Sequence, residues 1–276
     1  MNPADRGKLP EGGATGPISD VEGVLLCAGV GKRLGALTAD RPKALVPVAG
    51  RPVLNYHLTA WQEVGIRRAV LVTGHLREQV EEYVGDGARF GLEVDYAFQP
   101  ERRGTGDALR AARGSVRTPW LLVGYADVFF GEGVSLWRRL VADRRPKIVG
   151  ARVPNAGSYG RLLVDHEGSG GHLLGIQEKD RLPTPGLVNA GAYLLPHRVL
   201  ELTESIAPSP RGEFELTDAV TAWIAEGGEV EVVPTPSWVD IGTPEHLETA
   251  SRMARESSNP PSGVPGSPRP ARDHDE

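Results

Sequence analysis

The chain has 276 residues, enough for one large α/β domain or two small ones. Its net charge of −5 argues against a nucleic-acid binder or a membrane-surface binder, which usually present a basic surface. There is no apolar run of membrane-spanning length, and we expect no signal peptide because the N-terminal segment lacks an apolar core. A single cysteine, Cys27, excludes an intrachain disulfide and favours a reducing cytoplasm.

Both ends of the chain are poor in large apolar side chains. Residues 1–19 and 257–276 consist mostly of Pro, Gly, Ser and charged residues. Such segments bury too little surface to offset the entropy of ordering, so we expect both to be disordered. The ordered domain is therefore predicted to span residues 20–256.

Residues 20–146 alternate apolar runs with helical patterns. The predicted strands are 21–28, 69–73, 92–98 and 120–123, and the predicted helices are 52–64, 76–84, 104–113 and 134–142. In the first helix, Leu54, Leu58 and Trp61 form one apolar face, and Gly65 ends the pattern. Strands that alternate with helices predict an α/β fold, with a Rossmann-like, mostly parallel sheet covered on both faces.

Residues 147–256 follow a different pattern, with shorter strands. We predict strands at 147–152, 161–165, 172–177, 187–195 and 229–233, and helices at 197–204, at 215–226 and from Pro244 onward. No linker-like stretch separates this part from the first. We therefore expect two lobes, 20–146 and 147–256, that pack against each other.

The stretch LCAGVGKRLGALTADRPKAL, residues 26–45, combines glycines with cations. Backbone N–H groups and cations both attract phosphate, so this loop predicts a polyphosphate site. It does not fit the Rossmann fingerprint, whose third glycine falls on Leu34, nor the P-loop, because Arg33 stands where a hydroxyl should follow Lys32. Ligands of parallel sheets bind beyond the carboxyl ends of the strands, where both this loop and Asp127 are expected.

Together with later segments, this loop resembles the sugar-1-phosphate nucleotidyltransferases, or nucleotide-diphospho-sugar pyrophosphorylases. The family pattern of G-x-G-x-R-L, a threonine and Pro-Lys corresponds here to Gly29–Leu34, Thr38 and Pro42-Lys43. The later segments follow in family order: QPERRGTGDAL (99–109), YADV (125–128), YGRL (159–162), EKD (178–180), VNAGAY (188–193), GEFELTD (212–218) and WVDIGTPEHL (238–247). The match spans residues 21–252 and implies a GT-A-like fold, with a nucleotide-binding lobe at 20–146 and a sugar-binding lobe at 147–256. The middle segments are most similar to N-acetylglucosamine-1-phosphate uridylyltransferases, and DIGTPEHL to thymidylyl- and guanylyltransferases such as glucose-1-phosphate thymidylyltransferase.

The activity that this resemblance implies is attack by a sugar 1-phosphate on the α-phosphorus of a nucleoside triphosphate, with release of pyrophosphate. Two anions must meet, so cations and oriented amides matter more than a base. By resemblance, Arg33 and Lys43 act on the triphosphate and Lys179 neutralises the sugar phosphate. The implied nucleotide-binding residues are Cys27, Ala28, Gly29, Gly31, Gln99, Gly104 and Thr105. Cys27 itself has the surroundings of a small buried hydrophobe rather than of a nucleophile.

The resemblance also implies a magnesium ion held by Asp127 and Asp240, since carboxylates, phosphate oxygens and water suit its octahedral geometry. On the sugar side it implies Gly160, Glu178 and Asn189. The expected partners are thus a nucleoside triphosphate and a sugar 1-phosphate, with Mg²⁺ as cofactor and no nucleic acid or membrane; a homo-oligomer stays open.

We expect UTP or dTTP to be preferred over ATP and GTP. A uracil or thymine edge presents a carbonyl, N3–H and a second carbonyl, which the amide of Gln99 and the N–H of Gly104 can meet. Glu101 is close enough in sequence to suit guanine instead. The chain also departs from the family pattern at Lys32, Ala36, Ala126 and Asp180. At Ala126, where the family has glycine, a methyl group could crowd the nucleotide.

Several alternatives remain open at this point. The same reaction could use GTP or ATP, or act on a cyclitol phosphate. The chain could instead be a cytidylyltransferase for a non-sugar phosphate, or a regulatory paralogue that binds nucleotide sugars without catalysis. A nicotinamide oxidoreductase is disfavoured by the failed fingerprint.

Overall fold

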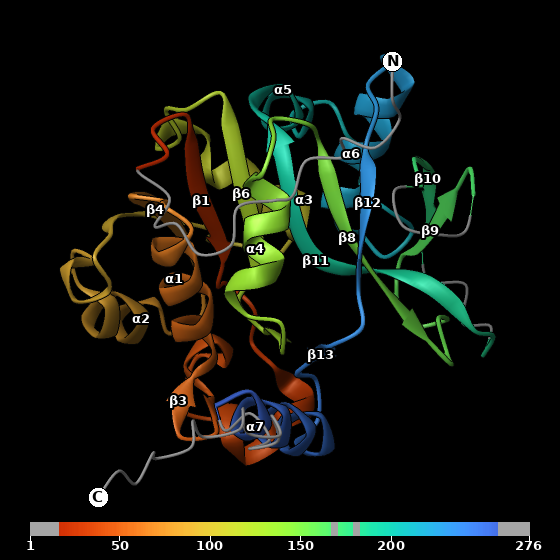
Figure 1. Ribbon diagram of the computed structural model, residues 1–276. Coiled ribbons are helices and arrows are strands. Elements are labelled where there is room, and N and C mark those ends of the chain that lie inside the picture. The colour runs from red at the N-terminus through yellow and green to blue at the C-terminus, as the bar shows by residue number, and fades with distance from the viewer. Residues whose placement is uncertain (1–16, 167–170, 179–182, 259–276) are drawn as a thin grey trace, which may run out of the picture.

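A computed structural model describes residues 17–166, 171–178 and 183–258, and its centre is one nine-stranded sheet (Figure 1). The strand order is β10-β9-β11-β6-β1-β4-β5, and β8 pairs with both β11 and β12. The strands are β1 (Val21–Leu26), β4 (Arg68–Thr73), β5 (Glu93–Phe98), β6 (Trp120–Tyr125), β8 (Lys147–Val153), β9 (Arg161–Val164), β10 (Leu173–Gln177), β11 (Gly186–Pro196) and β12 (Glu231–Thr235). Four short strands, β2 (Pro47–Val48), β3 (Arg51–Pro52), β7 (Val128–Phe130) and β13 (Trp238–Asp240), form two small ladders.

The sheet has a parallel half and a largely antiparallel half. Strands β6, β1, β4 and β5 run parallel, as the alternation of strands and helices predicts. β11 then pairs antiparallel with β6, β8 and β9, and β12 joins β8 in parallel. Because β11 pairs with β6, hydrogen bonds continue from residues of the first predicted lobe into the second.

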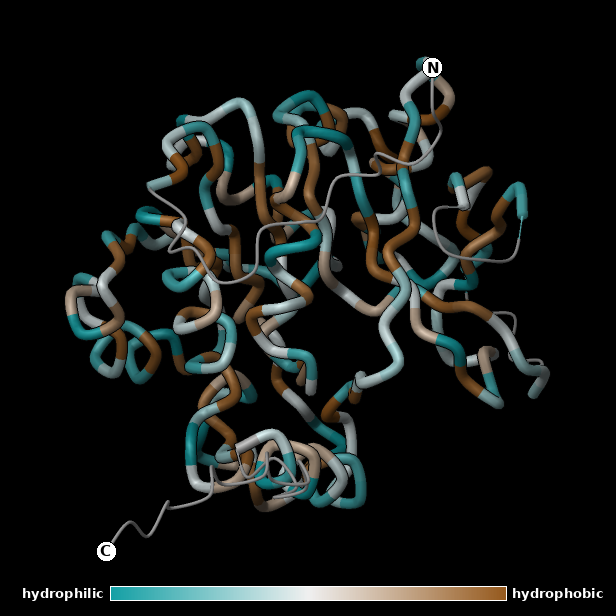
Figure 2. Tube along the Cα trace, viewed as in Figure 1, coloured by the Kyte–Doolittle hydropathy of each residue, from teal (hydrophilic) through white to brown (hydrophobic). Residues whose placement is uncertain are grey.

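Helices cover both faces of the sheet, which gives three layers. They are α1 (Val53–Glu63), α2 (Arg77–Val84), α3 (Thr105–Ala111), α4 (Val134–Val141), α5 (His197–Leu202), α6 (Leu216–Ala225) and α7 (Pro244–Ser258). One apolar cluster joins the sheet to α1, α2 and α4, and a second joins it to α3, α5 and α6. Figure 2 shows the resulting concentration of hydrophobic residues along the central strands. The predicted face of Leu54, Leu58 and Trp61 is fully buried in the first cluster.

A third, smaller cluster lies below the sheet in Figure 1, where α7 packs against β2 and β13. It includes Leu34 from the glycine loop, Phe129 from β7 and Ile241, which follows β13. The β7–β13 ladder sets Asp240 directly opposite Val128. The cluster therefore packs the glycine loop, the segment after β6 and the segment around Asp240 together.

The α/β fold predicted from the sequence is confirmed, and each predicted helix and strand corresponds to an observed one. The short strands β2, β3, β7 and β13 were not predicted. α7 ends at Ser258, inside the segment expected to be disordered, and the hydroxyl of Ser257 donates to the carbonyl of Gly131. Residues 1–16 and 259–276 lie outside the described residues. In the part of the chain that the structure describes, no helix is both long and apolar enough to span a membrane.

Candidate active site

Two adjoining cavities open at the carboxyl ends of the parallel strands. The β1 cavity, of about 270 Å³, lies between the glycine loop, β6 and the segment 99–108. The β11 cavity, of about 290 Å³, lies between β11, the segment 158–160 and β13. Five residues line both cavities: Lys43, Thr105, Tyr125, Asp127 and Glu215. A reaction between two bound molecules would therefore take place beside these shared residues.

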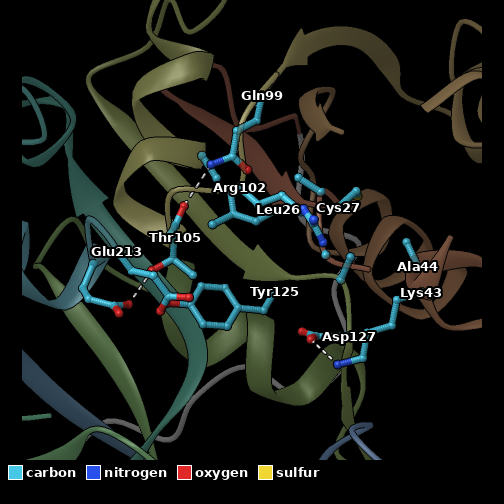
Figure 3. Close-up of a pocket in the computed structure, with 16 residues that line it drawn as sticks. Leu26, Cys27, Lys43, Ala44, Gln99, Arg102, Thr105, Tyr125, Asp127 and Glu213 are labelled. Carbon is cyan, nitrogen blue, oxygen red and sulfur yellow. Dashed lines mark hydrogen bonds and ion pairs between the residues drawn. The ribbon is translucent and has the colours of Figure 1, made fainter. Parts of the chain in front are cut away.

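The charged centre between the cavities consists of one lysine and two aspartates. Lys43 follows Pro42 in a short 3₁₀ turn, and its Nζ lies 2.5 Å from Asp127 Oδ2 (Figure 3). The same Nζ lies 3.8 Å from Asp240 Oδ1. Asp127 follows β6, and Asp240 ends β13. The backbone N–H of Ile241 donates to the carbonyl of Asp127, which ties the two acidic segments together. Asp127 and Asp240, which lie far apart in the sequence, thus meet at one cation, the ammonium of Lys43.

The environment of this centre favours cations. Burial raises the pKa of Asp240, and the neighbouring charge of Asp127 raises it further. Such a pair of carboxylates gains most from a bound positive charge. Arg33 adds a second cation, with Nη2 4.0 Å from Asp240 Oδ2 and 69% of its side chain exposed. The Arg33 guanidinium is therefore largely in contact with solvent, whereas the Lys43 side chain is 8% exposed.

The glycine loop leaves room beside β1. A side chain at Gly29 would meet no protein atom within 4 Å, so the backbone there borders open space within the cavity. Gly31 has a positive φ of 69° and packs on the aliphatic stem of Lys43, while the hydroxyl of Thr38 donates to its carbonyl. Gly29 therefore permits close approach of a ligand, and Gly31 shapes the loop around Lys43.

Cys27 and Ala28 form the apolar floor of the β1 cavity. Cys27 is 3% exposed, and burial raises the pKa of its thiol far above its ordinary value. The thiol is thus neutral, which agrees with the interpretation of Cys27 as a small hydrophobe. Ala126 also lines this cavity but is 1% exposed and belongs to the core cluster, so its methyl group is largely covered.

Gln99 and Gly104 both line the β1 cavity. Figure 3 shows Gln99 at the top of the view. The Nε2 of Gln99 donates to the carbonyl of Gly104 at 3.0 Å and to Asp107 Oδ2 at 2.9 Å. Both amide protons are therefore used within the protein, and Gln99 offers its Oε1 to a ligand. The prediction that this amide serves as donor and acceptor together is wrong, because only the acceptor is left for a ligand. Glu101 is exposed, pairs with Arg103 at 3.8 Å and does not line the cavity.

The β11 cavity is lined by hydroxyl and amide groups in a hydrogen-bonded chain. Asn189 Nδ2 donates to the hydroxyl of Tyr193 at 2.6 Å, and that hydroxyl lies 2.9 Å from the hydroxyl of Tyr125. The Asn189 Oδ1 accepts from the N–H of Gly191, and its backbone N–H donates to the carbonyl of Gly160. Burial raises the pKa of Tyr125 to about 12, so its hydroxyl keeps its proton at neutral pH. These groups suit neutral hydroxyls on a ligand.

A second network on this side connects the two cavities. Thr217 donates to Glu178 Oε1 at 2.5 Å, and Arg211 lies 3.5 Å from Glu178 Oε2 and bonds Glu215 as well. Glu215 lies close to the hydroxyl of Thr105, which in turn accepts from a backbone N–H of α6. Burial raises the pKa of Glu215, although Arg211 opposes that shift. The segment 211–217 thus contacts both the base of α3 and the β11 cavity.

Most of the site residues predicted from the sequence lie in these cavities. The β1 cavity contains Cys27, Ala28, Gly29, Lys43, Gln99, Gly104, Thr105 and Asp127, and the β11 cavity adds Arg33, Gly160, Glu178, Asn189 and Asp240. Gly31 lines neither cavity, and Lys179 lies outside the described residues. Asp218, in the segment GEFELTD, lies in the first turn of α6. Sequence reasoning missed Tyr125, Thr217 and Glu215, although all three belong to the segments YADV and GEFELTD.

Known proteins are similar to this chain in sequence and in fold. A family model described as nucleotidyl transferase matches residues 22–257. The bifunctional protein GlmU of Methanococcus maripaludis is 31% identical over 231 residues, or 84% of this chain and 54% of that protein. A glucose-1-phosphate thymidylyltransferase of Streptomyces griseus is 32% identical over 243 residues, or 87% of this chain and 68% of that protein. This chain thus spans about half of the first relative and two thirds of the second. A structure of UDP-glucose pyrophosphorylase complexed with UDP-glucose has the same fold, with a TM-score of 0.73 at 19% identity over 85% of this chain and 98% of that one.

Proposed function

The chain belongs to the nucleotidyl transferase family, and on that premise we propose that it transfers a nucleoside monophosphate from UTP or dTTP to a sugar 1-phosphate. The observation that carries this proposal is the position of Lys43, held between Asp127 and Asp240 where the β1 and β11 cavities meet. We assign the nucleotide to the β1 cavity and the sugar phosphate to the β11 cavity. The reacting phosphates would then meet beside the charged centre.

The reaction balances without a base or a nucleophilic side chain. An oxygen of the sugar phosphate forms a bond to the α-phosphorus, and the bond from that phosphorus to the α,β-bridging oxygen breaks. The electron pair leaves on pyrophosphate, and the sugar phosphate needs no deprotonation because it is already ionised at neutral pH. The neutral, buried thiol of Cys27 takes no part in this chemistry.

The protein's contribution is placement and positive charge. The open backbone at Gly29 lets the triphosphate approach closely, and Lys43 offers a fixed ammonium at the junction of the cavities. Arg33, whose side chain is largely exposed, can fold over the phosphates and offer its planar guanidinium to the leaving pyrophosphate. Lys179 is proposed, by family resemblance, to neutralise the sugar phosphate.

Asp127 and Asp240 are also the proposed ligands of Mg²⁺. Their fit to a cation is visible in the structure, since both carboxylates converge on the ammonium of Lys43. In the part of the chain described by the structure, no group of three or more His, Cys, Asp or Glu could hold a metal ion. Mg²⁺ commonly uses one or two carboxylates together with substrate phosphates, which matches this pair. When bound, it would supply charge neutralisation to the triphosphate.

The proposal of UTP or dTTP rests on Gln99 and Gly104. The Oε1 of Gln99 can accept from N3–H of uracil or thymine. The N–H of Gly104 makes no hydrogen bond within the described residues and can donate to a base carbonyl. The relative named a glucose-1-phosphate thymidylyltransferase supports a hexose 1-phosphate as the acceptor.

The test is a matrix of UTP, dTTP, GTP, ATP and CTP against several sugar 1-phosphates with Mg²⁺, read by release of pyrophosphate. We expect release with UTP or dTTP and a hexose 1-phosphate. The control reaction omits the sugar phosphate and should release no pyrophosphate. Binding of triphosphate without turnover for every acceptor would instead indicate a regulatory protein.

A further inference from the structure

We propose that Asp107 is a positioning residue that fixes the amide of Gln99 and thereby makes the β1 cavity reject cytosine. The inference rests on the proposed function, because it assumes that a nucleobase lies against Gln99. It goes further by naming a residue that does not line the cavity as a determinant of base choice. Asp107 would act only through Gln99.

Asp107 is buried and held in place by charged partners. It lies on α3 and is 6% exposed. One of its oxygens accepts from Arg103 Nη2 at 2.9 Å and lies 3.8 Å from Arg110 Nη1. Arg110 is itself anchored, since its guanidinium donates to the carbonyl of Thr203. The other oxygen of Asp107 therefore points at Gln99 from a fixed position.

The orientation of the Gln99 amide follows from the chemistry of its neighbours. One end of the amide faces the carbonyl of Gly104 and the carboxylate of Asp107, which lie within 3.0 and 2.9 Å. Both of these groups accept hydrogen bonds, and an ionised carboxylate has no proton to give. Only the NH₂ end of the amide can satisfy two acceptors, so the oxygen must face the cavity. With Gln99 4% exposed, the opposite orientation would leave a buried donor and acceptors unpaired.

An oxygen fixed in this way separates uracil from cytosine. Uracil and thymine carry a proton on N3, which Oε1 accepts, whereas cytosine has a lone pair on N3. Cytosine has the same ring and the same attachment to ribose, so in the same pose two acceptors would face each other. Leaving such groups unpaired in a buried site costs roughly tenfold or more in affinity. Guanine also carries a proton on the equivalent N1, so Asp107 does not by itself exclude GTP.

The test compares the preference for UTP over CTP in the wild-type protein and in Asp107→Asn. Asparagine can turn its NH₂ toward Gln99, which leaves the carbonyl of Gly104 as the one acceptor of the pair that still holds the Gln99 amide. The amide can then rotate and offer a donor to N3 of cytosine. We expect the wild-type protein to bind UTP at least about tenfold more tightly than CTP, and the ratio to fall by about tenfold in the variant. The ratio is measured within one preparation, so it does not depend on the fraction of protein that is folded.

Arg103→Gln is the matched control, because it removes a partner of Asp107 but leaves both acceptors facing Gln99. Its UTP:CTP ratio should stay within about twofold of wild type. Should Asp107→Asn fail to fold, Asp107→Ser provides the second variant, since its hydroxyl can donate as well as accept. The ratio should fall there too.

The measurements are binding titrations with UTP and CTP in the absence of sugar phosphate, followed by kcat/KM where pyrophosphate is released. A wild-type protein that binds CTP as tightly as UTP would overturn the inference, and so would an unchanged ratio in the folded Asp107 variants. If no triphosphate yields pyrophosphate with any acceptor, the proposed function fails, but the binding ratios still decide the role of Asp107.

Discussion

The β1 cavity and the β11 cavity meet at Lys43, yet they are built in different ways. In the β1 cavity the groups that face a ligand are held by backbone geometry or by buried partners, as Gln99 is held by Gly104 and Asp107. In the β11 cavity, side chains hold one another: Arg211 pairs with both Glu178 and Glu215, which line that cavity. The side chain of Arg211 is 35% exposed, so this network can exchange partners at low cost.

This difference indicates how the two cavities select their ligands. A cavity whose polar groups cannot turn rejects a molecule that presents the wrong donor or acceptor. A cavity whose carboxylates share one guanidinium can adjust to several arrangements of hydroxyl groups. We therefore expect strict selection of the base and more tolerant selection of the sugar. The predictions below test this contrast, in order of decreasing effect.

The largest effect is expected at the centre that both cavities share. Asp127→Asn keeps the shape of the side chain but removes its charge, so turnover should fall at least about a hundredfold with the fold intact. Pyrophosphate release at saturating Mg²⁺ measures the loss, and circular dichroism checks the fold. The control is Asp40→Asn, whose carboxylate is exposed and forms no ion pair within the described residues. Near-wild-type turnover of Asp127→Asn would contradict the assignment.

The rigidity of the β1 cavity is tested by Gly104→Ala. Gly104 has a φ of 106°, and a Cβ there would collide with the carbonyl of Phe214 and lie 2.8 Å from its nitrogen. Strain and collision together should lower the free energy of unfolding by about 2–4 kcal/mol and weaken binding of UTP. Urea unfolding measures the first effect. Gly114→Ala is the control, since a Cβ there meets no atom within 4 Å. Equal losses in the two variants would show that crowding at Gly104 is unimportant.

A third prediction concerns His57, which supports the segment that follows β6. Its Nε2 lies 2.8 Å from the carbonyl of Val128, next to Asp127, and burial lowers its pKa from 6.5 to about 4. The folded protein thus resists protonation of His57, and stability that is complete above pH 6.5 is lost as the pH falls toward 4. His57 should account for a loss of about 3 kcal/mol in the free energy of unfolding as the pH falls from 6.5 to 4.

The measurement is urea unfolding of wild type and His57→Gln at pH 7 and pH 4. Glutamine can still donate to Val128 but does not titrate, so the variant should lose less stability on acidification. His75→Gln, at an exposed position, should behave like wild type. Parallel losses in wild type and His57→Gln would exclude His57 as a source of the acid sensitivity.

The smallest effect is expected in the adjustable β11 cavity. Tyr193→Phe removes the hydroxyl that accepts from Asn189, so the Asn189 amide is held only through its oxygen, by the N–H of Gly191. The KM for the sugar phosphate should rise roughly three- to tenfold, while the KM for UTP stays unchanged. Tyr96→Phe is the control, because its hydroxyl bonds the carbonyl of Gly85 and lines neither cavity. An equal rise in both KM values would show that the cavities are not independent.

The same contrast explains what could be predicted from the sequence. Gly29, Gln99 and Asp127 come shortly after the ends of strands β1, β5 and β6, and the carboxyl ends of parallel strands lie at one edge of a sheet. No such rule predicts that the side chains of Tyr193 and Arg211 contribute to the site. Tyr193 reaches Asn189 across an irregularity in the pairing of β11 with β8, and apolar periodicity does not encode such an irregularity.

Asp240 was predicted only through the family resemblance. It belongs to β13, which has three residues and is too short to show an alternation. Its place opposite Val128 depends on the packing of α7 against β13 and β2. The orientation of the Gln99 amide was missed for a different reason. Asp107 comes eight residues later, and only the turn into α3 brings the two side chains together.

The pairing of β6 with β11 has a consequence for synthesis of the chain on the ribosome. β6, with the sequence WLLVGY, needs β1 on one side and β11 on the other, but β11 is translated some sixty residues after β6. Until then, one edge of an apolar strand at the centre of the sheet has no partner, and exposed edges of this kind promote aggregation. A nascent chain that stops before Gly186 therefore carries a complete glycine loop and Asp127, but also an open edge for chaperones to protect.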